Sequence, residues 1–121
     1  MANSVTEFEL GEVGSSTTLA PLYDFKTNGQ IKNTANVTYD LLDNISNYKL
    51  ILIEVMFYPT SNCYVRSELQ PTFIVNSGEM FSVYYGYSDS TYYIHFKCQS
   101  DNTITVVKGS GGYLVGLYGI R

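Results

Sequence analysis

The run of strand-forming residues at 48–58, YKLILIEVMFY, constrains the fold of this chain more than any other stretch. Successive side chains of a strand point to opposite faces, so one face of this segment is wholly apolar and should line a core; it consists of Ile51, Ile53, Val55 and Phe57. A short apolar run does not exclude a helix, but the β-branched and aromatic content and the flanking Asn47 and Pro59 favour a strand. The other face is apolar up to Glu54, which predicts a strand inside a sheet rather than at its edge.

Turn-forming residues recur along the rest of the chain at the short, even spacing that is typical of an all-β sandwich or barrel. The predicted strands cover residues 19–25, 37–42, 79–87, 91–99, 103–108 and 113–120, and a further strand or two short pieces fall in 63–75 with a break at Pro71. We predict an all-β fold, an antiparallel two-sheet sandwich of jelly-roll or Greek-key type formed by residues 19–121.

Residues 1–18 differ from this pattern, because they show little apolar periodicity and contain a run of Gly, Ser and Thr. We interpret them as an N-terminal arm that attaches the domain to a larger structure or packs against a neighbouring copy. A disordered tail is the alternative interpretation.

Charge and composition exclude several classes of partner. The formal net charge is −4, from 11 acidic and 7 basic residues, and no Lys/Arg cluster occurs, so we expect no nucleic-acid partner. No stretch has the length of a membrane span, and the N-terminus has no secretory signal, which predicts synthesis in a cytoplasm and no membrane insertion. In that compartment Cys63 and Cys98 should be reduced, partly buried thiols, although a disulfide between them is formally possible.

The sequence offers few residues for catalysis. His95 is the only histidine, no nucleophile motif accompanies it, and the two distant cysteines give no metal-ligand spacing. We therefore predict a protein that is not an enzyme, with no cofactor and no metal site.

Tyrosine is the unusual residue, with 12 copies in the chain and a concentration across one predicted hairpin at 84–93. A tyrosine ring gives a broad apolar face and a polar tip at low entropic cost, which suits recognition of sugars or proteins. The candidate ligand-binding residues are Tyr84, Tyr87, Tyr93 and His95. The alternative is that inward tyrosines fill the core and outward ones pair across strands.

Four segments stand out in order along the chain: LYDF at 22–25, NVTYDL at 36–41, ISNYKLILIEV at 45–55 and VGLYGIR at 115–121. Taken together, they resemble a C-terminal domain of tailed-bacteriophage virion proteins. The resemblance covers residues 19–121. Two features depart from the family: Tyr23 stands where tryptophan is frequent, and the short arm stands where a long upstream region is usual.

The resemblance implies a phage structural protein of the virion, made in the host cytoplasm. Such a protein acts as a tail-fibre or receptor-binding module, and we expect it to bind a glycan on the host cell surface. The alternative is a capsid decoration or tail-assembly protein whose partner is another virion protein. A carbohydrate-binding module of an enzyme is a third, less favoured interpretation.

The resemblance also implies a symmetric oligomer, most simply a homotrimer, and the predicted strand near the C-terminus could supply its contact. This strand has large apolar groups beside glycines that permit close approach of another backbone. The candidate contact residues are Tyr113, Val115, Leu117 and Tyr118, and a strand buried in the sandwich core is the alternative.

Overall fold

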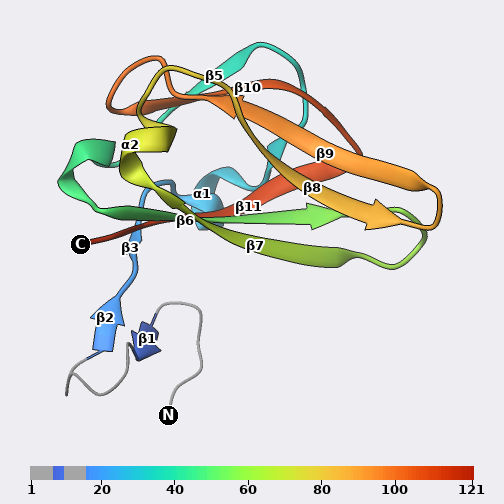
Figure 1. Cartoon of the computed structure of the whole chain (residues 1–121), viewed down its shortest axis with the longest axis horizontal. Coiled ribbons are helices and arrows are strands. Elements are labelled where there is room, and N and C mark those ends of the chain that lie inside the picture. The colour runs from blue at the N-terminus through green and yellow to red at the C-terminus, as the bar shows by residue number, and fades with distance from the viewer. Residues whose placement is uncertain (1–6, 10–15) are drawn as a thin grey trace.

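Two antiparallel sheets pack face to face in the computed structural model of the chain, which describes residues 7–9 and 16–121 (Figure 1). The five-stranded sheet has the order β3-β11-β6-β7, and β4 also pairs with β11; its strands are β3 (Ala20–Pro21), β4 (Ile31–Lys32), β6 (Leu50–Phe57), β7 (Tyr64–Pro71) and β11 (Gly112–Ile120). The four-stranded sheet has the order β5-β10-β9-β8; its strands are β5 (Val37–Asp40), β8 (Phe81–Tyr87), β9 (Ser90–Lys97) and β10 (Thr103–Ser110). The predicted two-sheet antiparallel sandwich is confirmed.

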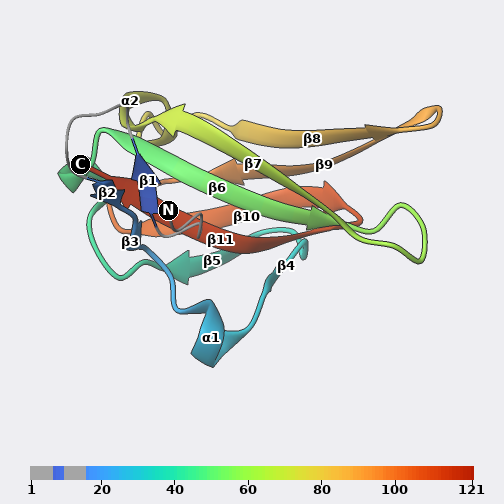
Figure 2. The same ribbon diagram turned by 90° about the horizontal axis from the view of Figure 1, so that it is seen from below.

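The chain folds back so that its first sandwich strands pair with its last. β3 and β4 both pair with β11, and β5 pairs with β10. Connections cross between the two sheets after β4, β5, β7 and β10, whereas the β6–β7 and β8–β9 pairs remain within one sheet. β7 and β8 are therefore the last strands of their sheets on the same side of the sandwich (Figure 2).

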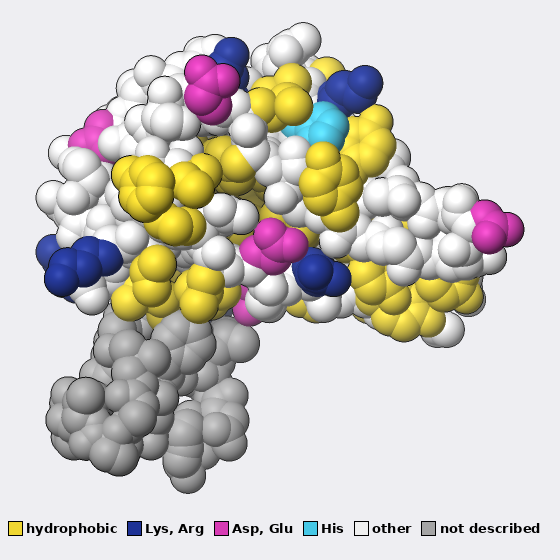
Figure 3. Space-filling model, in the orientation of Figure 1, with side chains coloured by type: hydrophobic (Ala, Val, Ile, Leu, Met, Phe, Trp, Pro, Cys, Tyr) yellow, Lys and Arg dark blue, Asp and Glu magenta, His cyan; other side chains and the backbone are white. Residues whose placement is uncertain are grey.

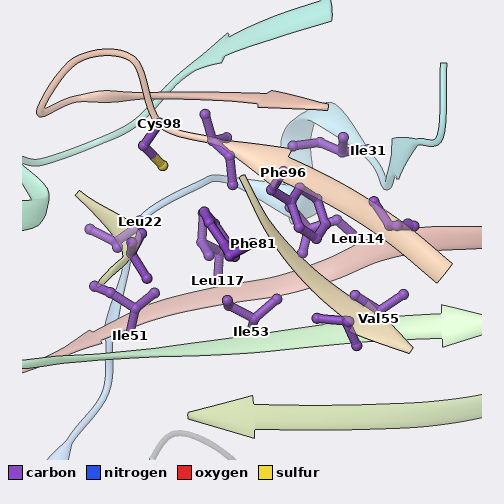
Figure 4. Packing of buried hydrophobic residues seen from close by; sticks show 14 of the residues in the cluster. Leu22, Ile31, Ile51, Ile53, Val55, Phe81, Phe96, Cys98, Leu114 and Leu117 are labelled. Carbon is purple, nitrogen blue, oxygen red and sulfur yellow. The ribbon is translucent and has the colours of Figure 1, made fainter. Parts of the chain in front are cut away.

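The central strand β6 is paired along its whole length, with β11 on one side and β7 on the other. The residues of its predicted core face, Ile51, Ile53, Val55 and Phe57, are each at most 1% exposed. They pack against inward side chains of the facing sheet, among them Phe81 and Phe96 (Figure 4). The prediction that this segment is an internal strand with one core face is confirmed.

The segment at 19–25 forms less strand than predicted. Only Ala20 and Pro21 pair with β11, and the short helix α1 (Phe25–Asn28) follows. Proline has no N–H to donate to a sheet, and the Asp24 side chain accepts a hydrogen bond from the Thr27 N–H (3.0 Å), which caps the helix. A helix of four residues leaves no periodic signal in the sequence, which is why the prediction was wrong here. Figure 2 shows α1 standing off the sandwich.

Two further short helices connect strands: the 3-10 helix η1 (Ile45–Asn47) before β6, and α2 (Thr72–Val75) after β7. The predicted break at Pro71 is the end of β7. Only Gly111, with φ of 69°, separates β10 from β11. Within the described residues, no helix has the length and apolar character needed to cross a membrane.

Part of the predicted arm is described. β1 (Glu7–Glu9) and β2 (Ser16–Thr18) form a separate antiparallel pair. Residues 1–6 and 10–15 lie outside the described part of the chain, and the attachment role of residues 1–18 stays a prediction.

The Tyr48 ring packs directly over the backbone of Gly119, where a Cβ would overlap it. The ring is held in place by a hydrogen bond from its hydroxyl to Asp43 (2.6 Å) and by the Arg121 guanidinium 4.9 Å from its centroid. An aromatic side chain that covers a strand glycine in this way requires the glycine to stay without a side chain.

We expect Gly119→Ala to lower the free energy of unfolding by about 1–3 kcal/mol, because the new methyl group must displace the Tyr48 ring. Gly86→Ala is the matched control, since no heavy atom lies within 4 Å of its Cβ position in β8. Urea unfolding followed by tyrosine fluorescence measures both; equal stability of the two variants would contradict the packing described.

Candidate functional site

Three of the four candidate ligand-binding residues meet on the outer face of the four-stranded sheet. Tyr84 on β8 lies directly opposite Tyr93 on β9. His95 follows on the same face of β9, and its ring stacks on Tyr93 with centroids 4.5 Å apart and planes at 26°. Tyr84 approaches His95 edge-on at 6.1 Å. We call Tyr84, Tyr93 and His95 the aromatic platform.

The platform is accessible but held in place. Tyr84 is 51% exposed, whereas Tyr93 and His95 are half-buried. Ser82 lies opposite His95 across β8 and β9, and its hydroxyl is 2.5 Å from His95 Nδ1. This hydrogen bond fixes the orientation of the imidazole. When the serine donates it, the proton of the neutral ring is on Nε2, which can then donate to a ligand.

Burial, and secondly the charge of Lys108, lower the pKa of His95 below its ordinary value of 6.5. Lys108 lies directly opposite His95 in the register of β9 and β10. A positive neighbour disfavours the imidazolium, so the ring keeps its neutral form to lower pH. Figure 3 shows the histidine in cyan beside hydrophobic side chains and a blue basic side chain.

Tyr87, the fourth candidate, is not part of this group. It lies on the same face of β8 as Phe81 and Val83, which are buried in the core. Its ring is the last of four rings that stack one after another from the core outward. Successive centroids are 5.7, 5.5 and 6.0 Å apart in the order Phe57, Tyr85, Tyr64, Tyr87. Tyr87 thus extends the packing between the sheets at their far end.

The outer face of the five-stranded sheet is largely apolar, unlike the outer face of the four-stranded sheet. We call it the outer apolar face. Two rows of side chains in register across β7, β6 and β11 belong to it: Val65, Met56 and Tyr113, and Leu69, Leu52 and Tyr118. Val65 and Leu69 are 57% and 48% exposed. The alternate residues Arg66 and Glu68 point to the other face of β7 and form an ion pair at 3.6 Å, while Ser67 lies opposite Glu54 on the outer face.

The candidate oligomer-contact residues divide between this face and the core. Tyr113 and Tyr118 belong to the outer apolar face, and Val115 lies at a bulge in β11 between Leu114 and Gly116. Leu117 instead is 2% exposed and belongs to the core of the sandwich, so its side chain is already covered within one copy. The alternation of β11 shifts at the bulge, which the sequence pattern did not indicate.

A cleft of about 460 Å³ adjoins the outer apolar face, with Val115 and Tyr118 on one wall and Tyr23 and Phe25 of the α1 region on the other. Tyr23 packs edge-on against Phe25 at 4.7 Å. The cleft was not predicted, because it depends on the short helix α1.

One carboxyl group interrupts the outer apolar face. The side chain of Glu54 lies over Gly116, and its burial raises its pKa, while a hydrogen bond with Ser67 acts in the opposite direction. Burial, and secondly the nearby Glu54, raise the pKa of Tyr118. A carboxyl group in these surroundings would lose further hydration if a partner covered the face.

The two cysteine thiols lie in different surroundings. Cys63 is exposed and Cys98 is buried, and they are not paired; burial raises the pKa of Cys98 to about 12. The prediction that both are partly buried was wrong for Cys63, which lies in the loop between β6 and β7. Among the described residues, no three His, Cys, Asp or Glu side chains gather as metal ligands would.

The comparisons with known proteins give no family for this chain. No protein-family model matches it, and no curated protein is significantly similar to it.

We expect Lys108→Gln to raise the pKa of His95, because the substitution removes a positive charge that faces the imidazole. Lys26→Gln, on α1, should leave that pKa unchanged. NMR titration of the imidazole resonances measures both variants, and an unchanged His95 pKa in Lys108→Gln would contradict the arrangement of β9 and β10 described above.

Proposed function

We propose that this chain is a structural protein of a tailed-bacteriophage virion, a tail-fibre or receptor-binding module that binds saccharide on the host surface. The observation that carries the proposal is the aromatic platform, in which three side chains from two strands present ring surface and polar atoms on one accessible face. The sequence resemblance to virion proteins supports the same role.

The platform has the features that a saccharide requires. Tyr84 and Tyr93 present apolar ring surface, and their hydroxyls and the His95 nitrogens can hydrogen-bond to sugar hydroxyls. The strands of a sheet hold the rings, so that little side-chain entropy is lost on binding. The proposal gives these residues a binding role and assigns them no catalytic step.

The second candidate function is assembly, in which the outer apolar face binds further copies of this chain as a homotrimer on the virion. The observation that favours it is the pattern of β7. Its apolar side chains at 65 and 69 face away from the sandwich, while charged Arg66 and Glu68 lie on the other face. Exposed apolar area of this kind marks an interaction surface. A capsid decoration or tail-assembly role with another virion protein would use the same face.

The platform is tested by binding of fluorescent protein to host cell-wall polysaccharide. Tyr84→Ala and Tyr93→Ala should each weaken binding by about 5–30-fold, since each removes a stacking surface worth roughly 1–2 kcal/mol. Tyr87→Ala is the matched control, because its ring stacks on Tyr64 away from the platform. An equal loss of binding in all three variants would contradict the assignment of the site to the platform. If the wild-type protein binds no wall in a broad panel of hosts, the proposed function is wrong.

The assembly is tested by the mass in solution. Light scattering should give a trimer at micromolar concentration, and Leu69→Lys should give a folded monomer, because its charge would be buried in the contact. Met80→Lys is the control, an equally exposed apolar residue that precedes β8 in the other sheet. A wild-type monomer, or a trimer that persists in Leu69→Lys, would contradict this use of the face.

A further inference from the structure

The charge around the aromatic platform is opposite in sign to that of the whole chain. The formal net charge is −4, yet the three strands β8, β9 and β10, all within the described residues, contain no Asp or Glu. They do contain Lys97 and Lys108. The charged side chains of these three strands are therefore all positive, and the exposed Asp40 of the same sheet lies on β5, beyond β10.

Both lysines adjoin His95. Lys108 is exposed and directly opposite it on β10, and Lys97 follows it by two residues, on the same face of β9. A β-bulge produces this placement: the register shifts between Val106 and Lys108, so that Val107 is the extra residue. In a regular ladder Val107 would oppose His95, and Lys108 would point toward the core.

Neither ammonium group has a carboxylate partner within the described part of the chain, where the one ion pair joins Arg66 to Glu68. The titratable groups on the strands around His95 are Tyr84 from β8, Tyr93 and Lys97 from β9, and Lys108 from β10. None of these carries a negative charge near neutral pH, so an anionic group beside His95 would meet no like charge from these three strands.

We infer that the aromatic platform binds an acidic saccharide, whose anionic group lies between His95 and the ammonium groups of Lys97 and Lys108. The inference rests on the proposed function and specifies the ligand class of that site. The sugar ring stacks on Tyr84 and Tyr93, and the anionic group accepts hydrogen bonds from the lysines and from His95 Nε2. Both a carboxylate, as in a uronic acid, and a phosphate, as in a polyol phosphate, provide this chemistry.

A nucleic acid is the less favoured polyanion. Two lysines suit one anionic group in each repeat of a polymer, whereas a nucleic-acid groove neutralises many successive phosphates.

Binding of an anion beside His95 should be linked to proton uptake. A nearby negative charge favours the imidazolium and so raises the pKa of His95 in the complex above that of the free protein. Affinity should therefore rise as pH falls through the pKa of the complex, and should level off below the pKa of the free protein. In His95→Gln this part of the pH dependence should be absent.

The test measures binding of the full chain to four probes by calorimetry: polygalacturonate, poly(glycerol phosphate), neutral dextran and a single-stranded oligonucleotide. We expect one of the two acidic polymers to bind at least tenfold more tightly than dextran, with an affinity that falls as salt rises. Which of them binds more tightly identifies the source of the charge. Lys97→Gln and Lys108→Gln should each weaken binding by about 3–10-fold, whereas Lys26→Gln should not.

The outcomes separate this inference from the function on which it rests. Equal binding of dextran and the acidic polymers, or full binding by both lysine variants, would overturn the inference and leave a neutral-saccharide module. Preference for the oligonucleotide would overturn it in favour of nucleic acid. If neither these polymers nor the host-wall panel bind, the proposed function itself fails.

Discussion

The pairing of β6 with strands on both sides is the constraint on which the rest of the structure depends. All eight residues of β6 are in register with β7, and β11 covers its other edge from Leu50 to Phe57. This fixes which side chains of three strands share a face. Burial of Ile53 and Val55 on one side then determines that Glu54 and Met56 must lie on the other. The outer apolar face is thus a geometric consequence of the core.

The two outer faces of the sandwich differ in polarity. A monomeric sandwich usually has polar side chains on both, alternating with the inward apolar ones. Here the four-stranded sheet follows that rule around its aromatic platform, and the five-stranded sheet does not. The contrast suits a protein that uses one side for assembly and the opposite side for a ligand, since the two sites would not compete for the same surface.

The sequence predicted most of the fold because strand alternation and turn residues are local signals. The core face of 48–58 and the inward positions of β9, such as Ile94 and Phe96, follow directly from a period of two. Three kinds of feature could not be predicted. The helix α1 is shorter than any detectable period, the bulges of β10 and β11 shift the alternation, and the partner of each strand is set by contacts distant in the chain.

The candidate site also contains some features that the sequence predicts and others that it does not. Tyr84, Tyr93 and His95 could be placed together because they lie on one hairpin with a predictable turn. Tyr87 could have been separated from them by alternation alone, because it follows Tyr84 by three residues and so lies on the opposite face of β8. The proximity of Lys108 to His95, by contrast, required both the β9–β10 pairing and its bulge. The outward positions of Val65 and Leu69 follow from the alternation of side chains along β7. The sequence analysis did not predict them, because Pro71 and the turn residues at 59–62 left the strand itself uncertain.

The bulge at Val107 also bears on how such a surface can change during evolution. Point substitutions alter one side chain at a time, whereas a change of pairing that made the ladder regular with all its residues kept would exchange the two faces of every residue from the bulge to the end of the strand. Deletion of Val107, the extra residue, would instead keep Lys108 opposite His95. Because the bulge is close to the end of β10, only a few positions are affected and the core before it is untouched. The extra residue is therefore the one position of β10 whose loss would regularise the strand while both the sandwich and the charge beside the platform are retained.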